Sequence, residues 1–427
     1  MNAIIENPSR DSWPELIKRP VMNAANLTDI VTQIIGIVKS QGDEAIKNYS
    51  SQFHGHAPAN LWVTSDEIER SSRFVSKNLR KSILLAKKNI ERFHKQQVLK
   101  IKKIETTRGV SCWRKSMPIQ NVGLYIPGGS APLFSTLLML AIPAKLAGCK
   151  NILVTTPANA SGDVDPAILY VAKILGIKNI YKAGGAQAVA AMAYGTQTVN
   201  KVDKIFGPGN QYVTEAKRLV NIDRVAIDML AGPSELAVYA DETGIPQFIA
   251  ADLLSQAEHG GDSQVVLVAA NKQVIEKVIL EIHSQLPALP RKEIIEKSFL
   301  NRGFLVIENA DDAFDFLNQY APEHLIIASE HAEALAEKVI NAGSVFLGNY
   351  SPESAGDYAS GTNHSLPTNG TAITQSGVSV DSFVKKITFQ KLSAEGLNNI
   401  GEAVENMASA EGLMAHKNAV AIRKNKH

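Results

Sequence analysis

The chain has 427 residues, 45% of them hydrophobic and 20% charged, with a formal net charge of +2. This length predicts two or more domains, and the balanced charge argues against a nucleic-acid-binding protein. The chain has only two cysteines, Cys112 and Cys149, which argues against a secreted disulfide framework and favours the reducing cytoplasm.

The N-terminal segment has no basic stretch followed by an apolar core, so we expect no signal peptide. The most apolar long stretch, residues 133–149, contains Pro143 and Lys145 and is too short to span a bilayer. We therefore expect no membrane association. Cys149 next to Lys150 leaves a nucleophilic role open, although a small buried side chain is the commoner role of a free cysteine.

Residues 1–118 form the first predicted segment, which is mainly helical because apolar side chains recur at helical spacing. Residues 119–235 then alternate short apolar strands with helices, a pattern typical of parallel βαβ units. The sequence from NVGLYIPGG through NILVTTP to NIYKAGG supplies the strands. We predict an α/β domain in this segment.

Residues 236–375 repeat the alternation, with strands expected at SQVVLVAA, GFLVIEN, HLIIAS and SVFLG. We predict a second α/β domain there. Residues 376–427 are expected to be a helical extension. The fold class is thus α/β, with two incomplete Rossmann-like parallel-sheet domains between a helical N-terminal segment and a helical C-terminal extension.

The dinucleotide pattern G-x-G-x-x-G follows none of these strands. Weaker glycine turns occur instead in IPGG (126–129), AGGAQA (183–188) and FGPGNQYVTEAK (206–217). Turns of this kind leave backbone N–H groups free for a phosphate or ribose. Each alone also fits an ordinary turn, but three at one sheet edge favour a ligand site beyond the carboxyl ends of the strands.

A metal site is the stronger candidate for chemistry. Gln256 and His259 in LLSQAEHG share a helix face at a spacing of three residues. With Asp357 from a glycine-rich loop and His416 from the last helix, they would supply nitrogen and oxygen donors that suit zinc, with cobalt or manganese as substitutes. Each histidine taken singly also fits a hydrogen-bonded structural residue.

Residues 321–325, APEHL, contain the acid–base candidates Glu323 and His324 at the entrance of a strand. An imidazole and a carboxylate in one cleft can divide two proton transfers. A solvated Glu–His turn is the alternative that the residues themselves leave open.

Several long segments together resemble the histidinol dehydrogenase family. In chain order they are VGLYIPGGSAPLFST, KVDKIFGPGNQYVTEAK, DMLAGPSE, LLSQAEHG, YAPEHL, GSVFLGNYSPESAGDYASGTNHSLPT and AEGLMAHKNAV. The resemblance extends from about residue 120 to 422 and is weaker in the N-terminal helices. Leu230 and Gly261 stand where the family often has proline, which affects only the expected rigidity of two loops.

The resemblance implies a zinc-dependent homodimer that oxidises L-histidinol through L-histidinal to L-histidine, the last steps of histidine biosynthesis, with NAD as co-substrate. One zinc ion per subunit would bind Gln256, His259, Asp357 and His416, the last from the other subunit. Glu323 and His324 would be the catalytic acid–base pair.

By the same resemblance, residues 119–235 would be the NAD-binding domain, residues 236–375 would bind metal and substrate, and residues 376–427 would reach the partner subunit. Tyr125, Gln187 and Asn210 would contact NAD. The substrate would contact the metal ligands, His324, Ser234, His364 and Glu411. Glu411, like His416, would come from the other subunit. Glu411 and His416 would be roughly 140° apart on one ideal helix, so we expect Gly412 to bend it.

Three alternatives differ in chemistry. A zinc alcohol dehydrogenase of the common type needs cysteine ligands and G-x-G-x-x-G, and the sequence has neither arrangement. A metal-dependent hydrolase would use the metal without a nucleotide. A non-catalytic homologue would bind a ligand only, which the intact acid–base and metal positions argue against.

Overall fold

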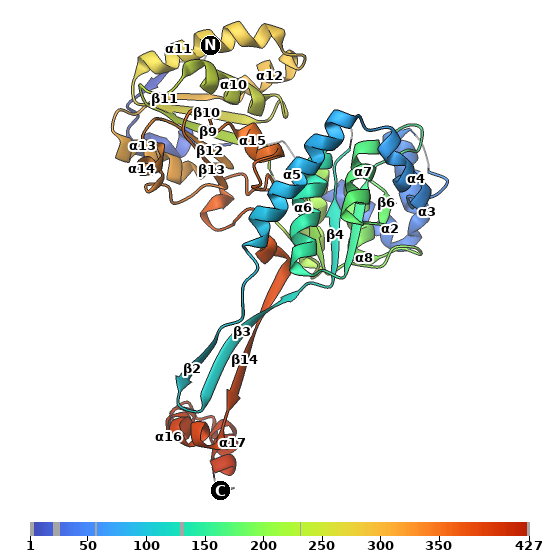
Figure 1. Cartoon of the computed structure of the whole chain (residues 1–427), viewed down its shortest axis with the longest axis vertical. Helices are drawn as coiled ribbons and strands as arrows, with labels where there is room; N and C mark the ends of the chain where they lie inside the picture. The colour runs from blue at the N-terminus through green and yellow to red at the C-terminus, as the bar shows by residue number, and fades with distance from the viewer. Residues whose placement is uncertain (1–3, 20–25, 56–57, 129–131, 231, 425–427) are drawn as a thin grey trace.

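The structure, a computed structural model, describes residues 4–19, 26–55, 58–128, 132–230 and 232–424. Two α/β halves lie side by side, and a narrow tail projects from them (Figure 1). The halves each contain a parallel sheet, whereas the tail contains an antiparallel one.

The first half is built on a five-stranded parallel sheet. Its strands, in spatial order, are β6 (Ile180–Lys182), β5 (Asn151–Thr156), β4 (Asn121–Tyr125), β7 (Lys204–Phe206) and β8 (Ala226–Ile227). Along the chain, β4, β5 and β6 are placed successively toward one edge of the sheet, and β7 and β8 toward the other edge. The order therefore reverses between β4 and β7, which is the topological switch point of a Rossmann-like sheet.

Helices cover both faces of this sheet, as a parallel sheet requires. One face packs against α5 (Lys77–Lys95), α6 (Phe134–Ala147) and α7 (Pro166–Leu175). The other packs against α2 (Leu27–Gln41), α3 (Asp43–His54), α8 (Gly185–Tyr194) and α9 (Gln211–Ile222). The short α4 (Ser65–Arg70) lies beside α7.

The second half repeats this plan with one added strand. In spatial order its strands are β1 (Ile5–Glu6), β11 (Gly303–Val306), β10 (Gln264–Ala269), β9 (Glu235–Ala240), β12 (His324–Ala328) and β13 (Ser344–Leu347). All of its strand pairs are parallel. Without the edge strand β1, the order is the same as in the first sheet, with the switch point between β9 and β12.

Two layers of helix bury the faces of the second sheet. The helices are α1 (Trp13–Leu16), α10 (Pro246–Ala257), α11 (Lys272–Gln285), α12 (Lys292–Ser298), α13 (Ala310–Tyr320), α14 (Ala332–Ala336) and α15 (Glu353–Tyr358). Successive side chains of β9 enter opposite cores, since Leu236 and Val238 face α10 while Ala237 and Tyr239 face α13.

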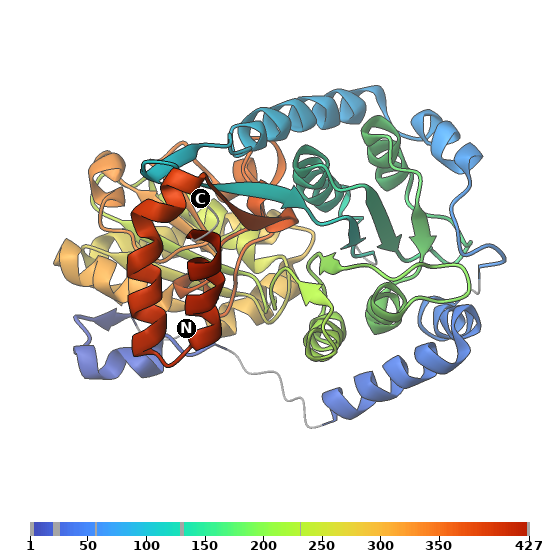
Figure 2. The same cartoon turned by 90° about the horizontal axis from the view of Figure 1, so that it is seen from below.

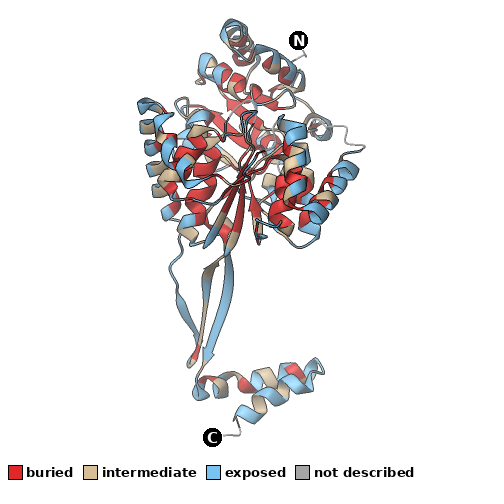
Figure 3. Cartoon of the chain, turned by 90° about the vertical axis from the view of Figure 1, so that its right-hand side faces the viewer, coloured by how far each residue is buried: buried red, intermediate tan, exposed pale blue. Residues whose placement is uncertain are grey.

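The tail combines distant parts of the chain. Strand β3 (Val110–Pro118) pairs antiparallel with both β2 (Lys103–Thr107) and β14 (Val384–Leu392), and α16 (Ala394–Ala410) and α17 (Met414–Lys424) follow. Figure 2 shows the two helices as an adjacent pair. The tail is mostly exposed in Figure 3, and none of the residues of α17 is buried.

The α/β class with two Rossmann-like parallel sheets is confirmed. The predicted helix over the last fifty residues holds for α16 and α17, but residues 384–392 form a strand instead. Its partner β3 is more than 260 residues away in the chain, so no local pattern could show the pairing. Strand β9, which the sequence prediction omitted, is the central strand at the second switch point.

The domain boundaries at residues 118, 235 and 375 remain predictions. The structure adds that the first residues of the chain pack in the second half, because β1 pairs with β11 and Trp13 is buried against Phe316. In the described residues, no helix is long and apolar enough to cross a membrane.

Candidate active site

A cavity of about 630 Å³ lies where the two halves meet. Its wall from the first half follows the carboxyl ends of β4 and β7. Its wall from the second half lies at the amino ends of β9 and β12. The residues used below that line it are Arg19, Gly207, Asn210, Lys217, Asp228, Ser234, His259, Glu323 and His364.

The predicted NAD residues lie at the carboxyl edge of the first sheet. Tyr125 ends β4, and its hydroxyl oxygen accepts a hydrogen bond from the Gly185 N–H at 3.1 Å. Gln187 lies in the first turn of α8, and its buried Nε2 has no hydrogen-bond partner among the described residues. An unpartnered buried donor is costly, so Gln187 is a good candidate for contact with a ligand.

Asn210 starts α9 at the same edge. Its Oδ1 accepts hydrogen bonds from the N–H groups of Tyr212 and Val213, which makes it the N-cap of the helix. Contact of its amide Nδ2 with NAD remains a prediction. Of the glycine turns predicted from the sequence, IPGG includes Gly129, which lies outside the described residues.

A buried ion pair holds the turn between β7 and α9. Lys217 and Asp228 form this pair, with side chains 2% and 3% exposed. The Lys217 Nζ donates to the Gly207 carbonyl at 2.9 Å, and the Gly207 N–H donates to Asp228 Oδ2 at 2.7 Å. A Cβ at Gly207 would lie 2.1 Å from the Tyr125 carbonyl oxygen, so this close approach requires glycine.

Glu323 and His324 meet at the amino edge of the second sheet, one residue before β12 and at its first residue. Both are buried. The Glu235 N–H donates to Glu323 Oε2 at 2.9 Å, and the Glu235 carbonyl lies 3.2 Å from His324 Nδ1. With Nδ1 donating to that carbonyl, Nε2 is the ring nitrogen left for acid–base chemistry; it has no hydrogen-bond partner in the described chain.

Burial raises the pKa of Glu323 to about 8. Burial by itself lowers the pKa of His324, but the carboxylates of Glu353, Glu323 and Asp357 outweigh it and raise that pKa to about 10. In the metal-free chain, His324 is therefore protonated near neutral pH. A cation among these carboxylates would oppose the rise in the His324 pKa.

The predicted metal ligands Gln256, His259 and Asp357 come together beside this pair. Gln256 is the penultimate residue of α10, His259 follows the helix, and Asp357 lies on α15. Ligand atoms of His259, Asp357 and Glu353 all lie within 4.8 Å of one another. His324 Nε2 is 3.5 Å from Asp357 Oδ1, so the acid–base pair and the metal candidates share one cluster.

Glu353 is the residue of this cluster that the sequence prediction missed. It is 2% exposed, and burial raises its pKa to about 8. With the Gln256 amide oriented so that donors meet acceptors, its nitrogen donates to Glu353 Oε1 at 2.5 Å and its oxygen accepts from the Glu235 N–H at 2.8 Å. The spacing of Glu353 and Asp357, four residues apart in PESAGD, could have identified them as neighbours on one helix face.

The predicted substrate residues Ser234 and His364 also line the cavity. His364 Nε2 lies 3.0 Å from the Thr136 hydroxyl on α6, and its Nδ1 lies 3.0 Å from the Asp357 carbonyl. Both ring nitrogens are thus engaged, and His364 connects the first half to the helix that carries Asp357. Substrate contact by His364 remains a prediction.

Glu411 and His416 are not brought to this cluster within one chain. Both are exposed in the tail, far from α10 and α15 in Figure 1. Gly412 lies between α16 and α17 with φ +72°, a left-handed conformation that ends one helix before the next begins. The expected bend is confirmed, and a single chain does not complete the predicted metal and substrate sets.

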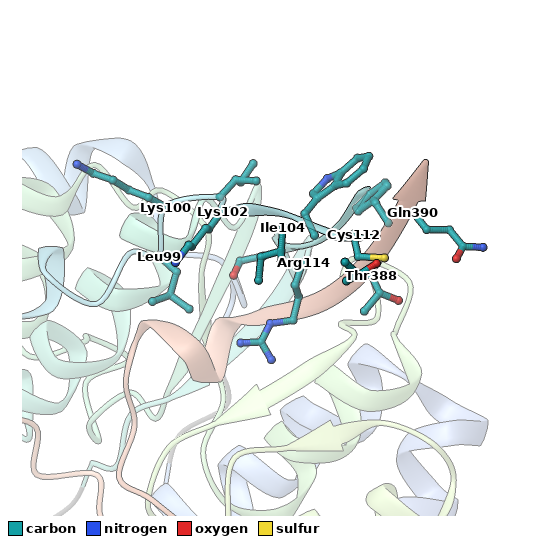
Figure 4. A pocket seen from close by; sticks show the side chains of 13 residues that line it. Leu99, Lys100, Lys102, Ile104, Cys112, Arg114, Thr388 and Gln390 are labelled. Atoms are coloured by element: carbon teal, nitrogen blue, oxygen red, sulfur yellow. The ribbon is translucent and has the colours of Figure 1, made fainter. Parts of the chain in front are cut away.

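A second cavity, of about 730 Å³, lies along the tail (Figure 4). Apolar and basic side chains line it, including Leu99, Lys102, Trp113, Arg114 and Phe389. No histidine or carboxylate is among its described lining residues, so it lacks the acid–base and metal-ligating groups of the first cavity.

Comparison with known proteins gives consistent matches over the whole chain. Residues 17–424 match the family model described as histidinol dehydrogenase. A histidinol dehydrogenase of Bacteroides thetaiotaomicron is 54% identical over 425 residues, covering 100% of this chain and 99% of that protein. One of Campylobacter jejuni is 48% identical over 98% of each chain.

Solved structures give the same match. The crystal structure of histidinol dehydrogenase from Elizabethkingia anophelis is 54% identical, with a TM-score of 0.96, and covers 98% of this chain and 97% of that one.

Proposed function

The chain belongs to the histidinol dehydrogenase family, and we propose that it oxidises L-histidinol through L-histidinal to L-histidine while two NAD⁺ are reduced. These are the last steps of histidine biosynthesis, which we expect to take place in the cytoplasm. The observation that carries the proposal is the buried pair Glu323 and His324, of which Glu323 lines the same cavity as the glycine turn of the first sheet.

The donor set supports zinc as the metal. Gln256, His259 and Asp357 offer amide oxygen, imidazole and carboxylate, and their neighbours Glu323 and Glu353 concentrate acidic groups at the same point. Zinc accepts nitrogen and oxygen ligands, and an N/O set without thiolate is typical of catalytic sites. The fourth ligand would be His416 from a second copy of the chain. Bound there, zinc would hold the imidazole and amino nitrogens of the substrate and fix its orientation.

His324 would act in the first oxidation. Its Nε2 accepts the proton of the substrate hydroxyl as the carbinol carbon loses a hydride to NAD⁺, which leaves the aldehyde. Because Nδ1 is held by the Glu235 carbonyl, the ring presents a fixed face to the substrate. The imidazole must be neutral for this step, and a cation beside Asp357 favours that state by offsetting nearby negative charge.

Glu323 would act in the second oxidation. A carboxylate takes a proton from water as the water oxygen adds to the aldehyde carbon, giving the hydrate. Loss of a second hydride to NAD⁺ and of a hydroxyl proton then yields the acid. The buried position of Glu323 at the cavity wall supports this role because a desolvated carboxylate with a pKa near neutrality is a suitable base.

Tyr125, Gln187 and Asn210 would contact NAD⁺. Tyr125 ends β4 and Asn210 follows β7, the neighbouring strands between which the strand order reverses, the place where nucleotides bind in such sheets. Gln187 lies two residues after Gly185, whose N–H donates to the Tyr125 hydroxyl. The site has no G-x-G-x-x-G turn, and we expect NAD⁺ to bind as a dissociable co-substrate.

The exposed tail supports a homodimer with shared active sites. Strand β2 is exposed throughout, and the tail leaves large apolar side chains in water. They include Leu99, Ile101, Ile104, Phe389, Met407 and Met414. A small three-stranded sheet whose two outer strands are mostly exposed has too little core to hold its place alone. A second chain would cover it and would receive Glu411 and His416.

The decisive experiment measures metal content together with histidinol-dependent formation of NADH. Protein with one zinc per chain should reduce about two NAD⁺ for each histidinol consumed, and chelation should abolish the reaction. Zinc-replete, dimeric protein that leaves the absorbance of reduced cofactor unchanged would contradict the proposal. Turnover without NAD⁺ would instead favour a metal-dependent hydrolase.

A further inference from the structure

A second buried ion pair, between Arg19 and Glu235, lies behind the acid–base pair. Their side chains are 13% and 1% exposed. The contact is bidentate: Arg19 Nε donates to Glu235 Oε1 at 3.1 Å, and Nη2 donates to Oε2 at 3.1 Å. The Asn369 N–H also donates to Glu235 Oε1 at 2.7 Å. Such a fork fixes the Glu235 side chain in direction as well as in charge.

Glu235 in turn holds both acid–base residues through its main chain. Its N–H donates to the Glu323 carboxylate, and its carbonyl faces His324 Nδ1. The Gln256 amide, in the orientation given above, accepts from the same N–H. One residue thus sets the position of the carboxylate and the ring nitrogen available for catalysis.

Arg19 also holds the turn that leads into β12. It donates to the Tyr320 carbonyl, and its guanidinium lies 4.0 Å from the centre of the Tyr320 ring. The next residue, Ala321, has φ +49°, which is unusual for a residue with a side chain. Arg19 therefore connects the start of β9 to the turn before Glu323.

We propose that Arg19 and Glu235 are positioning residues, whose ion pair sets the orientation of the Glu323 carboxylate and the His324 ring through the main chain of Glu235 and the Tyr320–Pro322 turn. Arg19 comes from the N-terminal segment, more than 200 residues before β9 in the chain. The kinetic test of this inference rests on the proposed function, whereas its structural test depends on geometry alone.

The kinetic test compares Arg19→Ala with wild type in histidinol oxidation. We expect kcat to fall about 100-fold, since misplacement of a catalytic group by about 1 Å has an effect of that size. KM for NAD⁺ should stay within about twofold of wild type because the cofactor residues lie on the other wall. In a Glu235→Gln background the same substitution should lower kcat much less.

Two further variants separate positioning from general loosening of the chain. Arg10→Ala removes an exposed ion pair with Asp312 and Asp315 from the same N-terminal segment and should leave kcat unchanged. Arg19→Lys keeps the charge and should fold even if Arg19→Ala does not. Its kcat should still fall about tenfold because an ammonium cannot form the paired contacts.

Some kinetic results would overturn the inference. One is a kcat for both Arg19 variants within about threefold of wild type, a span too small for a misplaced catalytic group. Another is an equal loss of kcat in the wild-type and Glu235→Gln backgrounds, which would mean that Arg19 does not act through Glu235.

Crystal structures of wild type and Arg19→Lys give a readout that needs no activity. We expect the variant to lengthen the Glu235 N–Glu323 Oε2 or Glu235 O–His324 Nδ1 separation beyond about 3.5 Å, the limit of a hydrogen bond. If both separations are unchanged, the positioning role is refuted. A wild-type enzyme inactive on histidinol would refute the proposed function, and the structures would still decide the role of Arg19.

Discussion

The two sheets have the same strand order but present opposite edges to the shared cavity. The first presents its carboxyl edge, where Tyr125, Gly207 and Asn210 give a glycine turn and a helix N-terminus. The second presents its amino edge, where Glu235, Glu323 and His324 give buried charged and titratable side chains. One fold plan thus supplies two kinds of surface, one suited to a phosphate and one to proton transfer and metal binding.

A buried ion pair stabilises each edge through main-chain atoms. Lys217 and Asp228 hold the Gly207 peptide of the first edge, and Arg19 and Glu235 hold the second. Disruption of the first edge should therefore change cofactor binding, and disruption of the second edge should change catalysis. The predictions below use this difference.

The largest effect is expected from His416→Ala. The substitution should lower zinc content and abolish activity, while NAD⁺ binding at the carboxyl edge of the first sheet should persist. This would show that only the second edge needs another chain. Zinc analysis, an activity assay and NAD⁺ titration by calorimetry would measure the three properties.

Mixing experiments test the sharing directly. Co-assembly of His416→Ala chains with inactive His259→Ala chains should restore about a quarter of wild-type activity, since half of randomly paired dimers contain one intact shared site. A mixture as inactive as its separate components would argue against sharing.

His324→Asn should lower kcat by about 10²–10⁴-fold, the usual contribution of a general acid–base group. Zinc content should not change because His324 is not among the predicted metal ligands, and KM for NAD⁺ should not change because the ring lies on the second edge. Steady-state kinetics and metal analysis would test this. His331→Asn, at an exposed histidine seven residues further on, is the matched control; equal activity of the two variants would remove His324 from the mechanism.

Lys217→Met should have the opposite kinetic profile. Loss of the lysine leaves Asp228 buried without its partner, which should lower the free energy of unfolding by about 3–5 kcal/mol. The loosened Gly207 turn should raise KM for NAD⁺ about tenfold while kcat changes little, a loss of about 1.4 kcal/mol of binding. Urea unfolding and kinetics would measure both.

Lys39→Met provides the control because it removes an exposed ion pair with Asp223 from the same half. It should lower the free energy of unfolding by less than about 1 kcal/mol. A kcat loss in Lys217→Met without any change in KM for NAD⁺ would contradict the division of labour between the two edges.

The smallest effect concerns Asp252, on α10 one turn before Gln256. Burial raises its pKa from 3.8 to about 7. Its pKa is higher in the folded chain than in the unfolded chain. The contribution of Asp252 to stability is therefore fully present below about pH 4 and is lost as the pH rises through 7. In metal-stripped protein, wild type should therefore lose stability relative to Asp252→Asn over this range, by at most about 1.4 kcal/mol per pH unit. Urea unfolding at several pH values would test this, and a pH-independent difference would refute it.

Local patterns predicted much of the site. The run NVGLYIPGG predicted β4, LLSQAEHG predicted a helix ending in polar residues, and YAPEHL placed Glu323 and His324 at a strand entrance; each lies as expected. The omissions were residues whose importance depends on distant contacts. Nothing around Arg19 indicates its pairing with Glu235, and nothing around residues 384–392 indicates pairing with β3.

The sequence by itself determined the α/β class, the alternation of strands and helices, and the residue types available for metal binding and proton transfer, because these follow from periodicity and side-chain chemistry within short windows. Only the tertiary structure decided which strand edges form the cavity, that Glu353 joins the acidic cluster, and that the tail carries His416 away from its own chain's site. Those outcomes depend on packing between elements that are far apart in the chain, where burial of apolar surface rather than local preference fixes the arrangement.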